Sequence, residues 1–305
     1  MIIILGAGII GLFSAYNLLK EGKQVKIFDS KNISGNATDA SVGMLSPAIE
    51  AKPGENELYY LMKESKNIWN NFYNDNKLRN KTGLKNNGSL MVALNEDDEE
   101  KLKFKQQFFK KIGYECNLLS SSETLKLEPC LNSNIKSSLF CKDQDQVNTK
   151  TLKNFLIEEI KEMGGEIFYG EKIRKLTLKE DKSVTFNELN MEFEKLIISC
   201  GSWSNEIISN SFGFKFPLIP LKGVSLLVDS LNDQLNYNLW FRNIYVAPRK
   251  NGKLAIGATE EEKGFDDSVK LDELYFLTKS IWESFPKLEE FKLDEINVGL
   301  RASVI

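Results

Sequence analysis

Apolar and polar positions follow two different patterns along the chain. Up to about residue 200, short apolar runs are separated by longer amphipathic stretches, and after Pro217 the pattern changes to a succession of alternating strands. The first pattern is typical of helices that alternate with strands, and the second of an antiparallel sheet. The sequence therefore predicts a mixed α/β (α+β) fold with two domains whose segments interleave.

The N-terminus shows the first pattern most clearly. Residues 2–5 form a wholly apolar run, as in the buried centre of a parallel sheet, and residues 25–29 form a second strand. Between them, residues 12–21 fit a helix, which Gly22 ends at a C′-like position. A strand–helix–strand unit is therefore expected here.

Further elements follow from the same periodicities. An amphipathic helix is expected over residues 56–80, with Leu58, Leu61, Met62, Ser65, Ile68, Trp69 and Phe72 on one side. Other helices are expected at 96–112, from a cap at 148–149 to 164–165, and at 271–285. The remaining predictions are a small antiparallel meander at 166–169, 172–179, 183–186 and 192–193, and strands at 88–94, 196–201, 222–228, 243–247, 254–257 and 296–301.

The first strand ends in Gly6-x-Gly8-x-x-Gly11, a spacing that fits a dinucleotide site. Gly6 permits a tight turn, Gly8 lets the backbone approach a pyrophosphate at the helix N-terminus, and Gly11 allows close helix–strand packing. Asp29, at the end of the second strand, can accept a hydrogen bond from a ribose hydroxyl and would repel a 2′-phosphate, which argues against NADP. The residues between the glycines, Ile9 and Ile10, belong to the same candidate site. NAD and FAD fit this Rossmann-like unit equally well, and a structural turn is the alternative.

A second candidate segment covers residues 37–47, where small and hydroxyl side chains suit a chain that lies against a ligand. A Ser/Gly loop without a ligand is the alternative interpretation. The candidate cofactor-binding residues in this segment are Thr38, Ala40, Ser41, Gly43, Met44 and Leu45.

Composition narrows the chemistry. The chain has 305 residues, a net charge of -3, no histidine and four well-separated cysteines. We therefore expect no metal site, no nucleic-acid partner, no membrane span and buried thiols in a reducing cytoplasm. The apolar N-terminus lacks both the preceding basic residues and the cleavage site of a signal peptide.

Arginine is scarce, with five among the 40 basic residues, so each one merits attention. Arg301 ends the apolar strand 296–301, which is a rigid platform for a bidentate carboxylate clamp. A strand-end surface cation is the alternative for Arg301, and Arg249 is expected to pair within the protein.

These motifs, taken in order, resemble the D-amino-acid-oxidase-like flavoproteins, and within them the glycine oxidases of thiamine (thiazole) biosynthesis. The resemblance covers the whole chain. Its strings are 6–11 with Asp29, 38–47, 197–204, 220–223, 245–249, 257–266 and 299–301. The family more often has Glu at the position of Asp29.

The resemblance implies FAD as cofactor and assigns roles to particular residues. The segment from Thr38 would pass the pyrophosphate and then the flavin ring, the backbone at Ile173 would reach the adenine, and Gly201 and Trp203 would lie near the cofactor. Arg301 would hold the carboxylate of an amino-acid substrate, and Tyr245 would add its hydroxyl.

The implied reaction is oxidative deamination of glycine or another small amino acid or amine by hydride transfer to flavin N5. Dioxygen would reoxidise the flavin and give hydrogen peroxide. A mechanism that uses a neutral amine needs no strong protein base, which is consistent with the missing histidine. The alternatives are a D-amino-acid dehydrogenase that reduces a quinone, a sarcosine-type oxidase, an NAD-linked dehydrogenase, and a flavin-binding protein without turnover. Soluble relatives of this kind are often homo-oligomers, so an oligomer is a further expectation.

The expected FAD-binding domain comprises residues 1–85, 145–217 and 294–305, and the expected substrate domain residues 86–144 and 218–293. The resemblance also implies a segment after the arginine-bearing strand that returns to the flavin. The sequence ends four residues past Arg301, at the apolar Ile305, so a form truncated relative to an active enzyme is expected.

Overall fold

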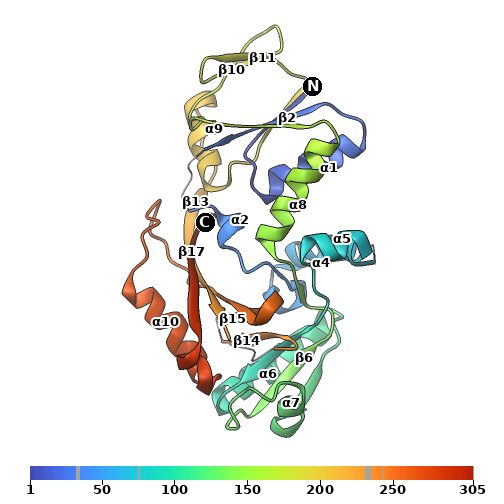
Figure 1. Ribbon diagram of the computed structural model, residues 1–305, viewed down its shortest axis with the longest axis vertical. Helices are drawn as coiled ribbons and strands as arrows, with labels where there is room; N and C mark the ends of the chain where they lie inside the picture. Colours follow the sequence, from blue (N-terminus) through green and yellow to red (C-terminus); the bar gives the residue numbers. More distant parts are fainter. Residues whose placement is uncertain (32–34, 75, 231–234, 243, 305) are drawn as a thin grey trace.

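The computed structural model describes residues 1–31, 35–74, 76–230, 235–242 and 244–304. Asp75, Asn243 and Ile305, which belong to a predicted helix, a predicted strand and the chain end, lie outside these residues. Figure 1 shows an elongated molecule, with a sheet that carries α1 and α8 in one half and a larger sheet beside α6, α7 and α10 in the other. The long strands β13 (Leu218–Asp229) and β17 (Lys292–Val304) extend along the molecule between them.

The first sheet has four parallel strands in the order β12-β1-β2-β8. Its strands are β1 (Ile2–Leu5), β2 (Val25–Ser30), β8 (Glu166–Gly170) and β12 (Lys195–Ile198). Helix α1 (Ile9–Lys20) connects β1 to β2 and packs against α8 (Thr149–Glu162). All four residues of β1 are buried, as expected for a central strand of a parallel sheet. The N-terminal strand–helix–strand prediction is therefore confirmed.

The second sheet has eight strands in the order β17-β13-β16-β15-β14-β4-β6-β5, antiparallel except for the pair β14 and β4. Its other strands are β4 (Ser89–Ala93), β5 (Asn117–Ser120), β6 (Ser137–Cys141), β14 (Asn238–Phe241), β15 (Ile244–Pro248) and β16 (Lys253–Gly257). Helix α10 (Leu271–Trp282) packs Leu277 and Ile281 into the apolar core of this sheet. The two sheets together confirm the predicted fold class.

The smaller elements complete the chain. Short helices are α2 (Ala37–Ala40), α3 (Pro47–Glu50), α5 (Asn76–Thr82), α7 (Ser121–Leu127) and α9 (Ser204–Phe212), and longer ones are α4 (Asn56–Asn74) and α6 (Glu96–Lys111). Strands β9 (Thr177–Leu178), β10 (Ser183–Phe186) and β11 (Leu189–Glu192) form a separate antiparallel sheet, and β3 (Met44–Leu45) pairs with β7 (Asp145–Gln146). The three-residue 3₁₀ helix η1 spans Gly201–Trp203.

Three predictions about local structure are wrong. Residues 166–169 belong to the parallel sheet, as β8, because they pair with β2 rather than with the meander. The strand predicted at 172–179 is reduced to β9, with Ile173 outside any regular element. On α4, Leu58, Leu61 and Ile68 are exposed, and the helix packs through Trp69 and Phe72 instead. Of the four cysteines, all free, Cys141 alone is fully buried.

The predicted domain division remains a prediction. Residues 294–305, which it assigns to the FAD-binding domain, include the last part of β17, and this strand pairs with β13 in the eight-stranded sheet. Strand β17 also contacts α2 and η1, which lie beside the parallel sheet. This segment therefore joins the two halves of the molecule.

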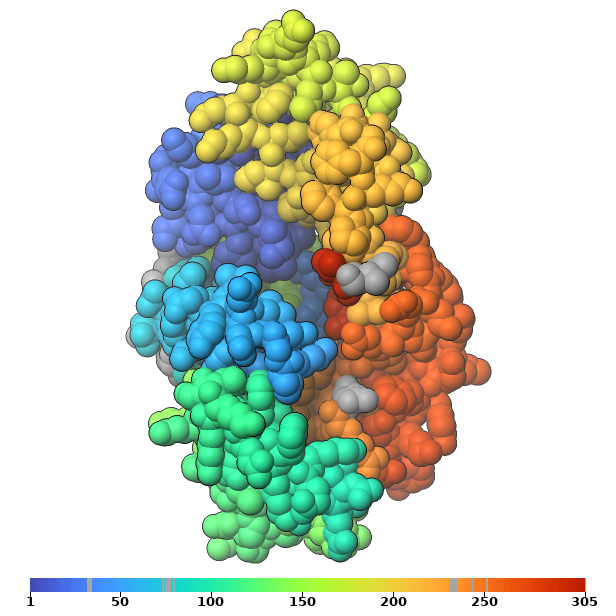
Figure 2. Space-filling model, turned by 180° about the vertical axis from the view of Figure 1, so that it is seen from behind, coloured from blue at the N-terminus to red at the C-terminus, as the bar shows by residue number. Residues whose placement is uncertain are grey.

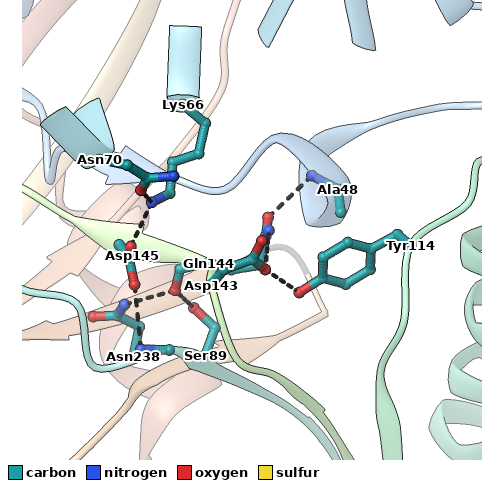
Figure 3. A network of polar contacts seen from close by, with 10 residues as sticks. Ala48, Lys66, Asn70, Ser89, Tyr114, Asp143, Gln144, Asp145 and Asn238 are labelled. Carbon is teal, nitrogen blue, oxygen red and sulfur yellow. Dashed lines mark hydrogen bonds and ion pairs between the residues drawn. The ribbon is translucent and has the colours of Figure 1, made fainter. Parts of the chain in front are cut away.

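A buried polar network fixes β7 at the junction of the two halves (Figure 3). The Nζ atom of Lys66, on α4, lies 2.6 Å from the Oδ2 atom of Asp145, and both side chains are almost fully buried. Next to Asp145, the Gln144 carbonyl accepts hydrogen bonds from Ser89 and Asn238 of the eight-stranded sheet at 2.6 and 3.2 Å. Because β7 pairs with β3, this network also holds the Met44 segment in place.

Glu128, just after α7, supplies a pH-dependent contribution to stability. It is fully buried, and its Oε1 atom accepts backbone hydrogen bonds from Asn236 and Tyr237 at 2.7 and 2.6 Å. Burial raises its pKa from 4.5 to about 7, although the two hydrogen bonds act in the opposite direction. Between these values the folded protein holds a proton that the unfolded chain has released, so the free energy of unfolding falls as the pH rises from about 4.5 to about 7.

We expect this component to amount to roughly 3 kcal/mol at most and to disappear in Glu128→Gln. Urea denaturation of both proteins at pH 5 and at pH 7.5 measures it. The wild type should lose more stability between the two pH values than the variant does. Equal losses in the two proteins would show that Glu128 does not titrate in this range.

Candidate active site

A cavity of about 680 Å³ opens at the carboxyl ends of the parallel strands and extends to the end of β17. We call it the dinucleotide cavity. In Figure 2 the surface is hollowed between the blue N-terminal part and the red end of the chain. The predicted residues that line it are Gly6, Gly8, Ile9, Ile10, Asp29, Thr38, Ile173, Gly201, Trp203 and Arg301. Folding thus brings Arg301 to the same cavity as these predicted nucleotide-site residues.

The glycines fit the roles that their spacing suggests. Gly6 has a φ of 101°, which an L-residue with a side chain rarely adopts. A Cβ atom on Gly11 would lie 1.9 Å from the carbonyl oxygen of Gly6, so only glycine fits where α1 meets this turn. At Gly8 the nearest atom to an added Cβ is Thr38 Oγ1 at 3.5 Å, and at Gly201 there is none within 4 Å. The backbone at both positions is therefore open to a ligand.

Asp29 and Thr38 hold the same turn through backbone hydrogen bonds. The Oδ2 atom of Asp29 accepts from Ala7 N at 2.9 Å, and its Oδ1 atom accepts from Ser30 N at 2.7 Å. Each carboxylate oxygen keeps further acceptor capacity for a ribose hydroxyl. Thr38 Oγ1 accepts from Ile9 N at 3.0 Å and so uses one free donor at the N-terminus of α1.

The remaining residues of the second candidate segment lie beside the dinucleotide cavity without lining it. Gly43 has a φ of 74°, and an added Cβ would lie 2.2 Å from the Val147 carbonyl oxygen. Met44 and Leu45 form β3, opposite Gln146 and Asp145. Ala40 and Ser41 line a smaller neighbouring cavity, where the Ala40 carbonyl accepts from Ser225 Oγ at 2.6 Å. The predicted contacts of these residues with the flavin remain predictions.

Arg301 lies on β17, and its guanidinium rests over Gly223 of β13. A Cβ on Gly223 would be 3.5 Å from Arg301 Nη2. Nη2 donates to the Thr259 carbonyl at 3.4 Å, and no ion pair to Arg301 is present within the described residues. The guanidinium is therefore anchored on one side and free to bind an anion with its other donors.

Tyr245 of β15 stands near Arg301 but does not line the dinucleotide cavity. Its ring centroid is 4.9 Å from that of Trp240. Burial raises the pKa of the Tyr245 hydroxyl to about 12, although the charge of Arg301 acts to lower it. The hydroxyl therefore keeps its proton at neutral pH and can donate a hydrogen bond.

Several residues near the cavity were not predicted. Lys153 of α8 lines it and pairs with Asp39 at 2.8 Å, and Lys172 lines it and pairs with Glu206 at 2.7 Å. Glu50, at the end of α3, is an exposed residue; desolvation by the surrounding protein raises its pKa, whereas the charges of Arg301 and Lys105 act to lower it. No local motif distinguishes these residues in the sequence.

Neither a metal-ligand cluster nor a helix that could span a membrane is present among the described residues. No group of three His, Cys, Asp or Glu side chains is placed there to hold a metal ion. Within the same residues, no helix is both long enough and apolar enough to cross a membrane.

The fold and the cavity define a two-sheet nucleotide-binding α/β protein that brings an arginine to its dinucleotide site. The profile of the FAD dependent oxidoreductase (DAO) family matches residues 1–304. The chain therefore belongs to this family and is an FAD-dependent oxidoreductase, which confirms the expected cofactor and family. The open backbone at Gly8 and Gly201 and the position of Asp29 fit such a cofactor.

Individual relatives of known name or structure are similar to this chain over nearly its whole length. Glycine oxidase of Bacillus licheniformis is 26% identical over 307 residues, a match that covers 98% of this chain and 80% of that protein. The structure of glycine oxidase from Geobacillus kaustophilus is similar with a TM-score of 0.90 at 22% identity, over 99% of this chain and 82% of the other. Iminodiacetate oxidase from Chelativorans sp. BNC1 has a TM-score of 0.88 at 19% identity, over 100% of this chain and 84% of the other. These likenesses to solved structures show the fold.

Proposed function

We propose that this chain oxidatively deaminates glycine or another small amino acid or amine, with dioxygen as the terminal oxidant and hydrogen peroxide as a product. The observation that carries the proposal is Arg301, which lines the dinucleotide cavity and forms no ion pair among the described residues. A carboxylate is the ligand that best matches a planar guanidinium. The names of the curated and structural relatives support the same substrate class.

In this proposal the protein binds and orients, while the flavin, when bound, accepts the two electrons. Arg301 holds the substrate carboxylate, and the Tyr245 hydroxyl donates a hydrogen bond to the same group. The α-carbon is thereby held in one orientation, which lowers the entropic part of the barrier. The neutral amine loses a hydride, that is two electrons and one proton, and becomes an iminium ion, which water hydrolyses to an oxo acid and an ammonium ion.

No histidine is available to remove the amine proton, so the substrate is expected to react as the neutral amine. A place in thiamine biosynthesis, a cytoplasmic location and a homo-oligomeric state belong to the same proposal. The first and third rest on the resemblance, and the cytoplasmic location is supported by four free cysteines.

The test is the absorbance spectrum of the FAD-loaded protein under nitrogen as glycine, sarcosine, D-alanine and iminodiacetate are added in turn. Bleaching of the flavin band by a small amino acid, followed by peroxide formation in air, supports the proposal. Bleaching without peroxide, together with reduction of a quinone dye, would indicate a dehydrogenase instead. A flavin band that no amine bleaches would contradict the proposal and indicate a flavin-binding protein without turnover.

A further inference from the structure

A second cavity, of about 540 Å³, lies between the parallel-sheet half and the eight-stranded sheet. One side is formed by residues at the end of α5 and the start of α8, and the other by residues between β15 and β16. The two cavities share no lining residue. We call this second one the basic cavity, because Lys85, Arg249, Lys250 and Lys253 line it.

The charges of the basic cavity are not balanced locally. Its described lining residues include four cations and no carboxylate. Lys253 pairs with Asp294 at 2.8 Å, but Lys85, Arg249 and Lys250 form no ion pair within the part of the chain that the structure describes. Lys85 Nζ instead donates to the Arg249 carbonyl at 3.3 Å.

Arg249 is held in place by neutral partners. Its guanidinium donates to the side-chain oxygen of Gln146 and to the carbonyl of Val42. Burial lowers its pKa to about 10, so it remains charged at neutral pH. The pKa of Lys85 is lowered first by burial and then by the charges of Arg249 and Lys250. The cations therefore repel one another, and a bound anion would relieve this repulsion.

Neutral donors surround the cations. Asn80 lines the basic cavity, and Asn148 and Thr151 place the N-terminus of the 14-residue helix α8 at its wall. The positive end of a helix dipole favours an anion in the same way as the lysines do. Asn148 already caps the helix by accepting from Thr151 N at 3.1 Å, so this N–H group is not available to a ligand. The helix end therefore adds its dipole to the charges of the cationic cluster and is not a site by itself.

We propose that the basic cavity binds the phosphate group of a small phosphate-bearing molecule. Phosphate fits because it accepts several hydrogen bonds and carries the negative charge that would balance the lysines and the arginine. The volume is large enough for a ligand with an organic part as well as the phosphate. The site is independent of the proposed oxidation, because it shares no residue with the dinucleotide cavity.

The test uses inorganic phosphate and pyrophosphate as probes, with the FAD-loaded protein in a buffer free of other polyanions. Isothermal titration should give saturable binding, tighter for pyrophosphate than for phosphate. The variant Lys85→Met/Lys250→Met should bind at least about tenfold more weakly, as expected from the loss of charge-assisted hydrogen bonds. The single variant Lys250→Met, at an exposed position, should show part of this loss even if the double variant folds poorly.

The matched control is Lys23→Met/Lys101→Met, which removes two exposed lysines away from the basic cavity and so the same net charge. Its affinity for pyrophosphate should equal that of the wild type. Absence of saturable binding to the wild type would overturn the proposal. So would an equal loss of affinity in the control, which would indicate general counterion attraction only.

Discussion

Replacing Arg301 with lysine is expected to raise the Michaelis constant for the preferred amino acid at least tenfold, although the charge is kept. The guanidinium can form two parallel hydrogen bonds with a carboxylate, and an ammonium group cannot reproduce that geometry. Losing a charge-assisted hydrogen bond costs about 1.5–3 kcal/mol, which corresponds to a tenfold or larger change. Steady-state peroxide assays over a range of substrate concentrations give the value.

Arg242→Lys is the matched control for this experiment. Arg242 pairs with Asp98 at 3.0 Å and does not line the dinucleotide cavity, so its replacement should leave the Michaelis constant unchanged. The flavin spectra of both variants should equal that of the wild type, which separates substrate binding from cofactor loss. A Michaelis constant that Arg301→Lys leaves unaltered would remove Arg301 from the substrate site.

Replacing Gly11 with alanine is expected to weaken FAD binding at least a hundredfold, or about 2.7 kcal/mol. The new methyl group would lie 1.9 Å from the Gly6 carbonyl oxygen and 2.7 Å from Ser199 Oγ, so α1 must move away from the turn. The N–H groups at the start of α1 would move with it, and these are the groups that face a pyrophosphate. Overpacking of this kind should also lower the free energy of unfolding by about 1–3 kcal/mol.

Titration of flavin-free protein with FAD gives the affinity, and urea denaturation gives the stability. Gly170→Ala is the control, since an added Cβ there meets no atom within 4 Å. That variant should keep wild-type affinity and stability. If Gly11→Ala bound FAD as tightly as the wild type did, the N-terminus of α1 could not be the pyrophosphate site.

Sequence patterns were most reliable where structure is local. The strand at 2–5, the glycine spacing and the cap at Asn148 depend on neighbouring residues, and the structure contains all of them. The buried strand of a parallel sheet needs only an apolar run, and a tight turn needs only a residue that tolerates a positive φ. Both requirements are visible in a short stretch of sequence.

Pairing partners were less predictable. Residues 166–170 have the composition of any strand, and only their contact with β2 makes them part of the parallel sheet. On α4 the apolar stripe suggested a buried face, but the helix packs beside Phe13 and buries Lys66 against Asp145. A helical periodicity shows which residues share a face, and the tertiary contacts decide which face is covered.

For the sites, the sequence by itself identified residues whose chemistry is unusual in a short motif, namely the glycines, Asp29 and the scarce arginines. Only the tertiary structure decided that Arg301 lines the same cavity as Gly8. It also decided that the charge of Arg301 acts on the pKa of Glu50, and that Lys85 and Lys250 line the same cavity as Arg249. Arg301 is far from Gly8 along the chain, and Lys85 is 164 residues from Arg249. The physical reason is that charges interact through space, so an electrostatic site appears only when the fold has set the distances between them.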